Sequence, residues 1–211
     1  MWGIDITAQG QGLASLFSWW GFMDQYSYSY AAVGNPKGMD ASLHANFRAD
    51  DIRKLQFSPS LRPAGKFYYK GAELNGFRNF SGPQSNIDSD SHYMRVAEFY
   101  LLHAEAAAEN GNYPAARTSL KALLDLRLDD SSYIDAMADT DLAEEAALQA
   151  RLELWGEGKS YFIMKRRRET RTRGANWLDY AGESFSHTDD RLTFLLPQAE
   201  ILFNPNIADQ N

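Results

Sequence analysis

The chain has 211 residues, of which 44% are hydrophobic and 23% are charged, and its formal net charge is −7 at pH 7. This length supports one domain with a buried core, and the composition is too apolar for an intrinsically disordered protein. The acidic balance lacks the overall field that nucleic acid or an anionic membrane would attract. Without cysteine the chain has no disulfides, thiolate nucleophiles or thiolate metal sites, and it has no apolar run as long as a membrane span.

The first residues already look like part of a folded element. Residues 2–7 alternate apolar and polar side chains, which predicts a strand. No basic and apolar leader of a secretory signal precedes this pattern. Chain termini are usually loose and polar, so this start indicates a fragment of a longer protein.

An aromatic segment, residues 17–30, lies within a predicted loop over residues 8–40. It holds seven rings in fourteen positions, against 13% aromatic residues in the chain: Phe17, Trp19, Trp20, Phe22, Tyr26, Tyr28 and Tyr30. Exposed rings stack on the C–H faces of sugars, and the hydroxyls of sugars need polar groups at the rim. The candidate ligand-binding residues are therefore Trp19, Trp20, Tyr26, Tyr28 and Tyr30. The alternative is a loop whose rings fill gaps in the core.

The middle of the chain is predicted to be mostly irregular. Residues 41–57 fit a short helix, with Asp50 and Asp51 near the start of its last turn. Residues 58–90 carry many Gly and Pro residues, and residues 66–70 are the best candidate for a strand within them.

From residue 91 the pattern becomes helical. Apolar side chains recur every three or four residues from Met94 to Ala108, Asn110-Gly111 marks a helix end, and a second helix follows Pro114 to about Arg127. These two helices form an antiparallel hairpin. A third helix starts near Asp141, with Glu144 at capping-box spacing, and runs to Trp155, which we expect to fill a core slot that Gly156 and Gly158 make accessible. A hydrophobic stretch at 192–196 and a short helix from Pro197, ended by residues 204–206, complete the chain.

Three segments in fixed order resemble the C-terminal half of the SusD/RagB family of outer-membrane nutrient-binding lipoproteins. Residues 93–106 are similar to its R-x-A-E-x-Y-L-x-x-A-E-A helix, residues 151–166 to its E-L-x-x-E-G-x-R-x-x-D-L-x-R segment, and residues 196–207 to its P-I-P-x-x-E-x-x-x-N-P-x-L close. Ser160 and Ile163 depart from that pattern, which has a basic residue and Asp there. We interpret the three motifs as structural.

The resemblance implies a mainly α fold: a SusD-like C-terminal region with a helical hairpin, long irregular loops and a few short strands. It implies one domain over residues 1–211, loop-rich over 1–90 and helical over 91–211. The tetratricopeptide-like N-terminal part, the signal peptide and the lipid-bearing cysteine are expected to lie outside this chain. The implied function is non-catalytic capture of a glycan or related nutrient at the cell surface, as a lid over a SusC-like, TonB-dependent transporter. The family has no fixed contact motif, so no ligand residue is carried over.

The charges have ordinary interpretations. Acidic residues crowd positions 129–157 and basic residues positions 159–173, which favours neutralisation within the chain or a solvated face over nucleic-acid binding. Arg95, Glu98 and Glu105 are interpreted as surface or satisfied charges, with interhelical ion pairs as the alternative.

The sequence offers few residues in the patterns that a catalytic or metal site requires. Glu153 and Glu157, one helical turn apart, fit a common surface pattern better than a glycosidase pair. His92 and His103, on one predicted helix, would lie about 16 Å apart, too far for one metal. No cofactor is expected, although calcium could bind oxygen ligands at Asp50-Asp51 or Asp189-Asp190. We predict that the chain is not an enzyme. The alternatives are a protein-interaction module built on the hairpin at 91–127 and, less favoured, a glycoside hydrolase.

Overall fold

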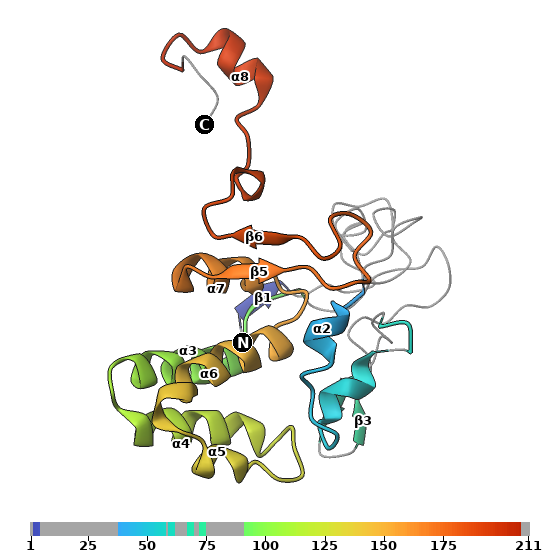
Figure 1. The fold of residues 1–211 in the computed structure, drawn as a ribbon, viewed down its shortest axis with the longest axis vertical. Helices are drawn as coiled ribbons and strands as arrows, with labels where there is room; N and C mark the ends of the chain where they lie inside the picture. Colours follow the sequence, from blue (N-terminus) through green and yellow to red (C-terminus); the bar gives the residue numbers. More distant parts are fainter. Residues whose placement is uncertain are drawn as a thin grey trace.

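The computed structural model of the chain describes residues 2–4, 38–57, 59–61, 67–69, 72–74 and 91–207, with the backbone alone for the strand residues up to position 93. This part of the chain is mainly helical, as the sequence predicts (Figure 1). In chain order its elements are β1 (Trp2–Ile4), α2 (Ala41–His44), the 3-10 helix η1 (Ile52–Gln56), β2 (Phe67–Tyr69), β3 (Ala72–Leu74), β4 (Ser91–Met94), α3 (Val96–Glu109), α4 (Tyr113–Leu124), α5 (Tyr133–Ala136), η2 (Asp139–Asp141), α6 (Leu142–Glu153), α7 (Lys159–Arg167), β5 (Thr170–Thr172), β6 (Ser184–Ser186), η3 (Asp190–Leu192) and α8 (Gln198–Phe203).

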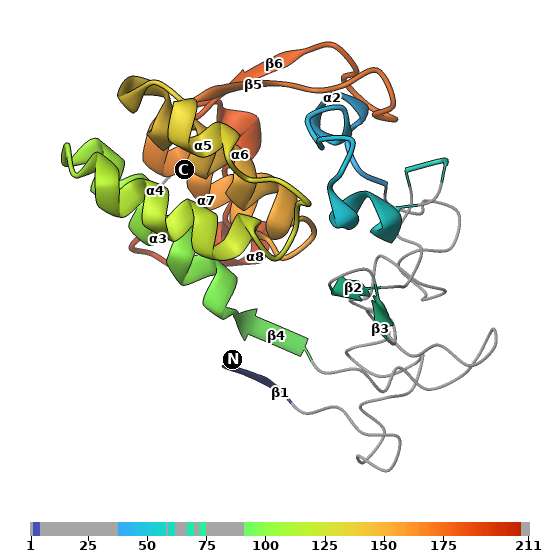
Figure 2. The ribbon, with the colours of Figure 1, turned by 90° about the horizontal axis from the view of Figure 1, so that it is seen from below.

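The main core lies between α3, α4 and α6, which pack side by side (Figure 2). Small residues on α3 and α6 let the helix axes approach closely, and leucines fill the remaining space. The fully buried members of this core are Leu101, Ala104, Ala116, Leu120, Leu124, Ile134, Leu142, Ala146 and Ala147. The predicted hairpin is confirmed, because Gly111 takes the left-handed conformation (φ 75°) between α3 and α4 and Asn112 caps α4.

A second, smaller cluster joins α2 and η1 to the C-terminal end of α6. Met39, Leu43 and Phe47 bury their side chains against Leu152. Trp155 is half-buried beside this cluster and meets Phe57 edge-to-face, with the ring centroids 5.1 Å apart. Trp155 therefore packs against the core, as expected.

Gly158 has a different role from the expected one. A Cβ added to Gly158 would meet no atom within 4 Å, so this glycine is not needed for close approach. Its φ of 75° instead allows the left-handed turn that begins α7.

The strands form three antiparallel pairs among the described residues: β1 with β4, β2 with β3, and β5 with β6. The predicted strands at the N-terminus and within residues 66–70 are confirmed. Pairing of Trp2 with Met94 makes residues 91–94 a strand, so the helix begins at Val96 and not at residue 91. His92 therefore lies on a strand, and the helix-face comparison of His92 with His103 does not apply.

The single helix predicted over residues 41–57 is wrong. After one turn of α2, the Asn46 side-chain amide donates to the Ser42 carbonyl at 2.7 Å and ends the helix. Asp51 then caps η1 by accepting from the Arg53 backbone N–H at 2.9 Å. Two local side-chain bonds thus replace the continuous helix. The capping box at Asp141 is also absent, because its side chain makes no cap hydrogen bond, although α6 starts where predicted.

A buried ion network, made of Asp51, Arg53, Arg95, Arg127 and Glu153, joins four parts of the fold. Only 3% of the Glu153 side chain is exposed. Its carboxylate accepts from Arg127 at 2.9 and 3.0 Å, from Arg95 at 3.1 Å and from Arg53 at 3.3 Å. Arg53, 2% exposed, also holds Asp51 at 2.7 Å. The end of α6 is thereby tied to η1, to the start of α3 and to the segment after α4.

The surface interpretation of Glu153 and Glu157 is therefore wrong. Glu157 pairs with Arg95 at 2.7 Å and is largely buried. Burial alone would raise the pKa of Glu153, but the hydrogen bonds and charge of Arg127 and the charges of Arg53 and Arg95 outweigh it and lower the pKa to about 2.

The charge segregation seen in the sequence is resolved within the chain. Glu98 pairs with Lys159 at 3.1 Å and Glu105 pairs with Arg166 at 2.6 Å, both across α3 and α7. Arg167 reaches Glu144 on α6 at 2.6 Å. The basic run is thus neutralised by α3 as well as by the acidic run, and the interhelical ion pairs, held as the alternative, are present.

The C-terminal residues form an arm, residues 193–207, that extends from the helical body and ends in α8 (Figure 1). The helix begins after Pro197, as predicted. The hydrophobic stretch before it is exposed, with 93% of Phe194 accessible to solvent. No helix in the described ranges is long and apolar enough to cross a membrane.

Replacing Glu153 tests the buried network. The folded pKa of about 2 lies below the ordinary 4.5, so Glu153 stabilises the fold fully above about pH 5 and loses this contribution as the pH falls toward 2. We expect Glu153→Gln to lower the free energy of unfolding at pH 7 by about 3 kcal/mol, because three arginines lose their partner charge. Urea denaturation at pH 7 and pH 3 measures both effects, and the variant should lose less stability than the parent between these two pH values.

The matched control for this change is Glu109→Gln, at a glutamate whose side chain is 64% exposed and 3.5 Å from Arg167. It should change stability by less than about 1 kcal/mol. Equal stability losses in the two variants would contradict a structural role for the network.

Candidate functional site

The ligand-binding residues predicted from the sequence, Trp19, Trp20, Tyr26, Tyr28 and Tyr30, lie outside the described residues. Their role stays a prediction. The described chain resumes at Gly38, eight residues after Tyr30. The candidate site is therefore built from the side chains that surround this point.

Asp40 fixes the chain after the aromatic segment to the loop between β5 and β6, residues 173–183. Its carboxylate accepts from the Gly174 backbone N–H at 2.7 Å and from the Trp177 indole N–H at 2.5 Å. The same carboxylate caps α2 through the backbone N–H groups of Ser42 and Leu43. We call this arrangement the Asp40 clamp.

A second pair of hydrogen bonds supports the clamp. The Asn176 side-chain amide donates to the Met39 carbonyl at 2.8 Å and accepts from the Ala41 backbone N–H at 2.8 Å. Asn176 thus completes backbone bonding on both sides of Asp40. The β5–β6 loop is held by side-chain contacts that no local sequence pattern indicates.

The Asp40 carboxyl is ionised at neutral pH. Burial would raise its pKa, but hydrogen bonds from Ser42, Gly174, Trp177 and Leu43 outweigh this and lower the pKa to about 2. The clamp is therefore a set of charge-assisted hydrogen bonds, which are stronger than neutral ones.

The clamped loop presents two exposed rings with two guanidinium groups beside them, which we call the Trp177 surface: Arg173, Trp177, Tyr180 and Arg191. Trp177 is 44% and Tyr180 is 51% exposed. Arg173 lies 4.4 Å from the centre of the Trp177 ring and 5.4 Å from that of Tyr180, and Arg191 lies 5.6 Å from that of Tyr180.

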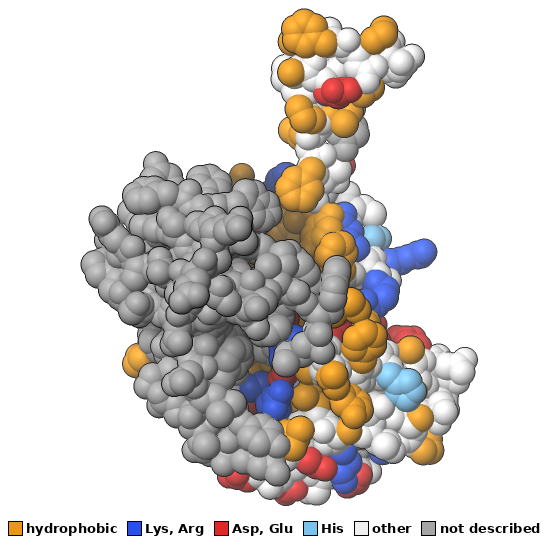
Figure 3. All heavy atoms as spheres, turned by 180° about the vertical axis from the view of Figure 1, so that it is seen from behind, with side chains coloured by type: hydrophobic (Ala, Val, Ile, Leu, Met, Phe, Trp, Pro, Cys, Tyr) orange, Lys and Arg blue, Asp and Glu red, His pale blue; other side chains and the backbone are white. Residues whose placement is uncertain are grey.

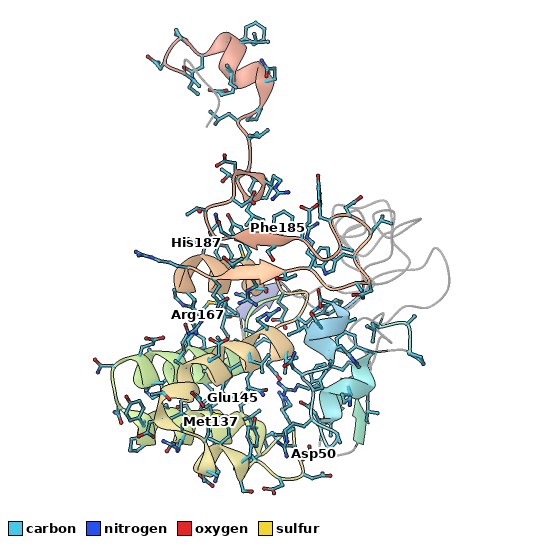
Figure 4. The ribbon with its side chains drawn as sticks, viewed as in Figure 1. Asp50, Met137, Glu145, Arg167, Phe185 and His187 are labelled. Atoms are coloured by element: carbon cyan, nitrogen blue, oxygen red, sulfur yellow. The ribbon has the colours of Figure 1, made fainter. Side chains whose placement is uncertain are left out.

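Phe185 forms the base of this surface. It is buried on β6, and Arg173 and Arg191 lie 4.6 and 4.2 Å from its ring centre (Figure 4). Rings with an apolar face and nearby donors are what the faces and hydroxyls of a sugar require. The sequence contains a signal for this site, two rings three positions apart between Gly174 and Gly182, but such a signal is also typical of an ordinary loop.

Neither pair of aspartates considered for calcium forms a metal cluster in the described ranges. Asp51 accepts from Arg53, and Asp189 accepts from Arg191 at 2.8 and 2.9 Å. These carboxylates satisfy arginines and are not gathered with further acidic groups there.

The comparisons with known proteins place this geometry in a family. Residues 54–207 match the SusD family. The chain belongs to the SusD family. The family segments at 93–106, 151–166 and 196–207 correspond to α3, to the end of α6 with α7, and to α8.

The solved structures show the same fold. A SusD superfamily protein from Bacteroides vulgatus is 19% identical (TM-score 0.65; 91% of this chain and 41% of that one), and one from Bacteroides thetaiotaomicron is 21% identical (TM-score 0.64; 88% and 43%). A SusD-like carbohydrate binding protein from Bacteroides vulgatus is 23% identical (TM-score 0.55; 81% and 41%). The chain thus spans about two fifths of these proteins. No curated protein matches it.

The SusD family motifs are structural in this chain, as expected. Arg95, from the first segment, binds Glu153 and Glu157 of the second. Glu98 and Glu105 of the first pair with Lys159 and Arg166 of the second. The matching residues therefore lock α3 against α6 and α7, and the Trp177 surface lies outside all three segments.

Replacing Gly174 tests the clamp. A Cβ at this position would lie 2.6 Å from an Asp40 carboxylate oxygen, so Gly174→Ala must separate the loop from Asp40. We expect the amide hydrogens of residues 173–183 to exchange at least about tenfold faster, because a charge-assisted hydrogen bond is lost. Asp40→Asn should act in the same direction.

Asp179→Asn is the matched control, since Asp179 is an exposed aspartate on the same loop. It should leave the exchange rates near those of the parent chain. Unchanged exchange in Gly174→Ala, with the helical circular dichroism retained, would show that the clamp does not hold the loop.

Proposed function

We propose that this SusD family chain binds an oligosaccharide or related nutrient without catalysis, at the bacterial outer-membrane surface, and delivers it to a SusC-like, TonB-dependent transporter. The observation that carries the proposal is the Trp177 surface, an exposed pair of rings with guanidinium donors on a loop that Asp40 holds in place. Family membership and a structural neighbour described as carbohydrate binding support the same ligand class.

The aromatic segment extends this proposed binding surface. Trp19, Trp20, Tyr26, Tyr28 and Tyr30 precede the Asp40 clamp in the sequence, and the proposal assigns them further ring contacts to the same glycan. Each ring contributes on the order of 1 kcal/mol beyond its buried area, so we expect micromolar or weaker affinity.

We further propose that residues 1–90 and 91–211 form one domain. Two contacts support this: β1 pairs with β4 across the whole loop-rich part, and the Asp40 clamp joins α2 to the β5–β6 loop. In this arrangement the helical part supplies the scaffold and the loop-rich part supplies most of the rings.

The glycosidase alternative loses its candidate pair in this structure. A glycosidase needs one carboxyl group with a raised pKa to protonate the leaving group. Three arginines lower the pKa of Glu153 to about 2. Arg95 donates to the Oε1 atom of Glu157 twice, from Nε at 3.1 Å and from Nη2 at 2.7 Å. Both carboxylates are therefore structural.

An exposed apolar face supports a second role for the same chain, contact with a protein. α3 and α7 expose large apolar side chains: Val96, Phe99, Tyr100, Leu102, Tyr161 and Phe162. Figure 3 shows apolar side chains in a band that continues from the C-terminal arm onto the body of the molecule. This face includes α3 of the hairpin at 91–127, for which the protein-interaction alternative was made, and adds α7 to it. It is a different surface from the Trp177 surface, and the transporter is our proposed partner there.

Glycan titration tests the proposed function. In calorimetry against a panel of neutral oligosaccharides, Trp177→Ala should weaken binding about tenfold, since a stacking face is removed. Trp19→Ala and Trp20→Ala should weaken it similarly. Binding should also change tryptophan fluorescence, whereas a pure protein-interaction module would leave it unchanged.

Phe203→Ala, at an aromatic residue that is 83% exposed on the C-terminal arm, serves as the control and should bind like the parent chain. No heat with any glycan, or equal affinity in all the tryptophan variants, would overturn the proposed site.

A further inference from the structure

A cavity of about 680 Å³, with both polar and apolar side chains on its wall, is lined by residues of α2, α6 and β5. Glu145 and Met137, both labelled in Figure 4, belong to its wall. The polar side chains that matter most for its chemistry are Ser42, Asn46, Glu144, Arg151, Glu169 and Arg171. Its volume falls within the range of small-molecule sites in proteins and suits one or two sugar rings.

The carboxylates on the wall already have partners. Glu144 binds Arg167 at 2.6 Å, and Glu169 binds both Arg167 and Arg171. Glu145 accepts from the Tyr133 hydroxyl at 2.6 Å and from the Gln149 side-chain amide at 2.8 Å. Asp141 accepts from the hydroxyl of its neighbour Thr140 at 3.1 Å. Each acidic side chain on the wall thus accepts at least one hydrogen bond within the protein.

The two arginines on the wall, unlike the carboxylates, have buried nitrogen atoms without hydrogen-bond partners. Arg151 has no hydrogen-bond or ion-pair partner among the described residues, and its Nε is buried. Arg171 binds only Glu169 there, and its Nε and Nη1 atoms are buried without an acceptor. Burial lowers the pKa of Arg151, and the charge of Arg171 lowers it further. Two guanidinium groups on the same wall thus have buried donors without acceptors, and buried donors are nearly always satisfied in proteins.

The Asp40 clamp connects the cavity with the Trp177 surface. Asp40 binds the Trp177 indole and caps α2, whose Ser42 and Leu43 line the cavity. The charge of Asp40 also acts on Arg151. A glycan stacked on Trp177 would therefore have its next sugar units within reach of the cavity.

We propose that this cavity holds an acidic unit of the glycan, with its carboxylate or sulfate group bound by Arg151 and Arg171. The inference rests on the proposed function and narrows its substrate class to anionic oligosaccharides. A planar guanidinium fork matches two oxygens of such a group, and the group supplies the acceptors that Arg151 lacks. The Thr170 hydroxyl and the Asn46 carboxamide oxygen on the wall offer partners for the sugar hydroxyls, whereas the Ser42 and Thr172 hydroxyls already bond Asp40 and Ser184.

Calorimetry on the unmodified chain tests the substrate class first. The probes are a trigalacturonate, its fully methyl-esterified form, and a sulfated galactan disaccharide with its desulfated counterpart. We expect the charged form of at least one pair to bind about tenfold to a hundredfold more tightly than its neutral form, and the pair that shows this identifies the group as carboxylate or sulfate. Equal affinity within both pairs would overturn the inference.

Two substitutions test the role of Arg151. Arg151→Gln should remove the preference for the charged form, and Arg151→Lys should retain part of it, because the charge stays while the fork is lost. Arg168→Gln is the matched control, at an exposed arginine that ends α7 and lies outside the cavity, and should keep the full preference. A preference that is the same in Arg151→Gln and Arg168→Gln would overturn the assignment of Arg151.

These outcomes separate the inference from the proposed function. Binding of neutral glycans that depends on Trp177, without a preference for charged forms, would contradict only the acidic subsite. Absence of binding to every neutral and charged glycan would contradict both. Because the methyl-ester comparison needs no substitution, an unfolded Arg151 variant would still leave the wild-type result to decide.

Discussion

The fold depends on one buried carboxylate. Glu153 stands at the end of α6, where Arg127, Arg95 and Arg53 arrive from the segment after α4, from the start of α3 and from η1. A carboxylate sealed from water is costly unless several donors surround it, and removing any partner leaves unpaired buried charge. The network therefore fixes how the smaller cluster around Met39 sits on the helical core. Everything attached to that cluster, α2 and the Asp40 clamp included, takes its position from this joint.

The Asp40 clamp in turn positions the β5–β6 loop at the surface. Asp40 follows the aromatic segment and begins α2, while Gly174 and Trp177 come from a loop more than 130 residues later. One ionised side chain thus sets both a helix start and the orientation of an exposed indole. The family motifs explain the scaffold beneath, since their charged residues join α3 to α6 and α7. The proposed ligand surface lies outside those motifs, which is the arrangement that allows one scaffold to carry different loops and different specificities.

The sequence predicted the helices that packing and local signals both favour. The apolar residues that recur from Ala97 to Ala108 and the helix-ending Gly111 indicate the same boundaries, so α3 and α4 could be predicted from the sequence alone. The sequence alone does not show that the helix predicted over residues 41–57 is interrupted, because the interruption depends on the hydrogen bond from the Asn46 amide to the Ser42 carbonyl. Glu153 and Glu157 have the spacing of a solvent-facing pair, and only tertiary contacts distinguish a solvated turn from a buried one. The sequence around Trp177 is that of an ordinary loop. The orientation of its indole depends on a hydrogen bond to Asp40, and no pattern in the neighbouring sequence predicts that contact.

The arginines of this protein are of two kinds, those with carboxylate partners and those with buried donors left unpaired. Arg53, Arg95, Arg127 and Arg167 each meet carboxylates whose geometry accounts for most of their donors, so their conformation is explained by stability alone. Arg151 belongs to α6, as Glu153 does, but it points away from the network toward the cavity and meets no acceptor in the described part of the chain. Burial and the charge of Arg171 lower the pKa of Arg151 and outweigh the charges of Glu169, Asp40 and Glu144, which raise it. A group that costs stability in the free protein is explained if a ligand supplies the missing acceptors, because the cost is then recovered in binding.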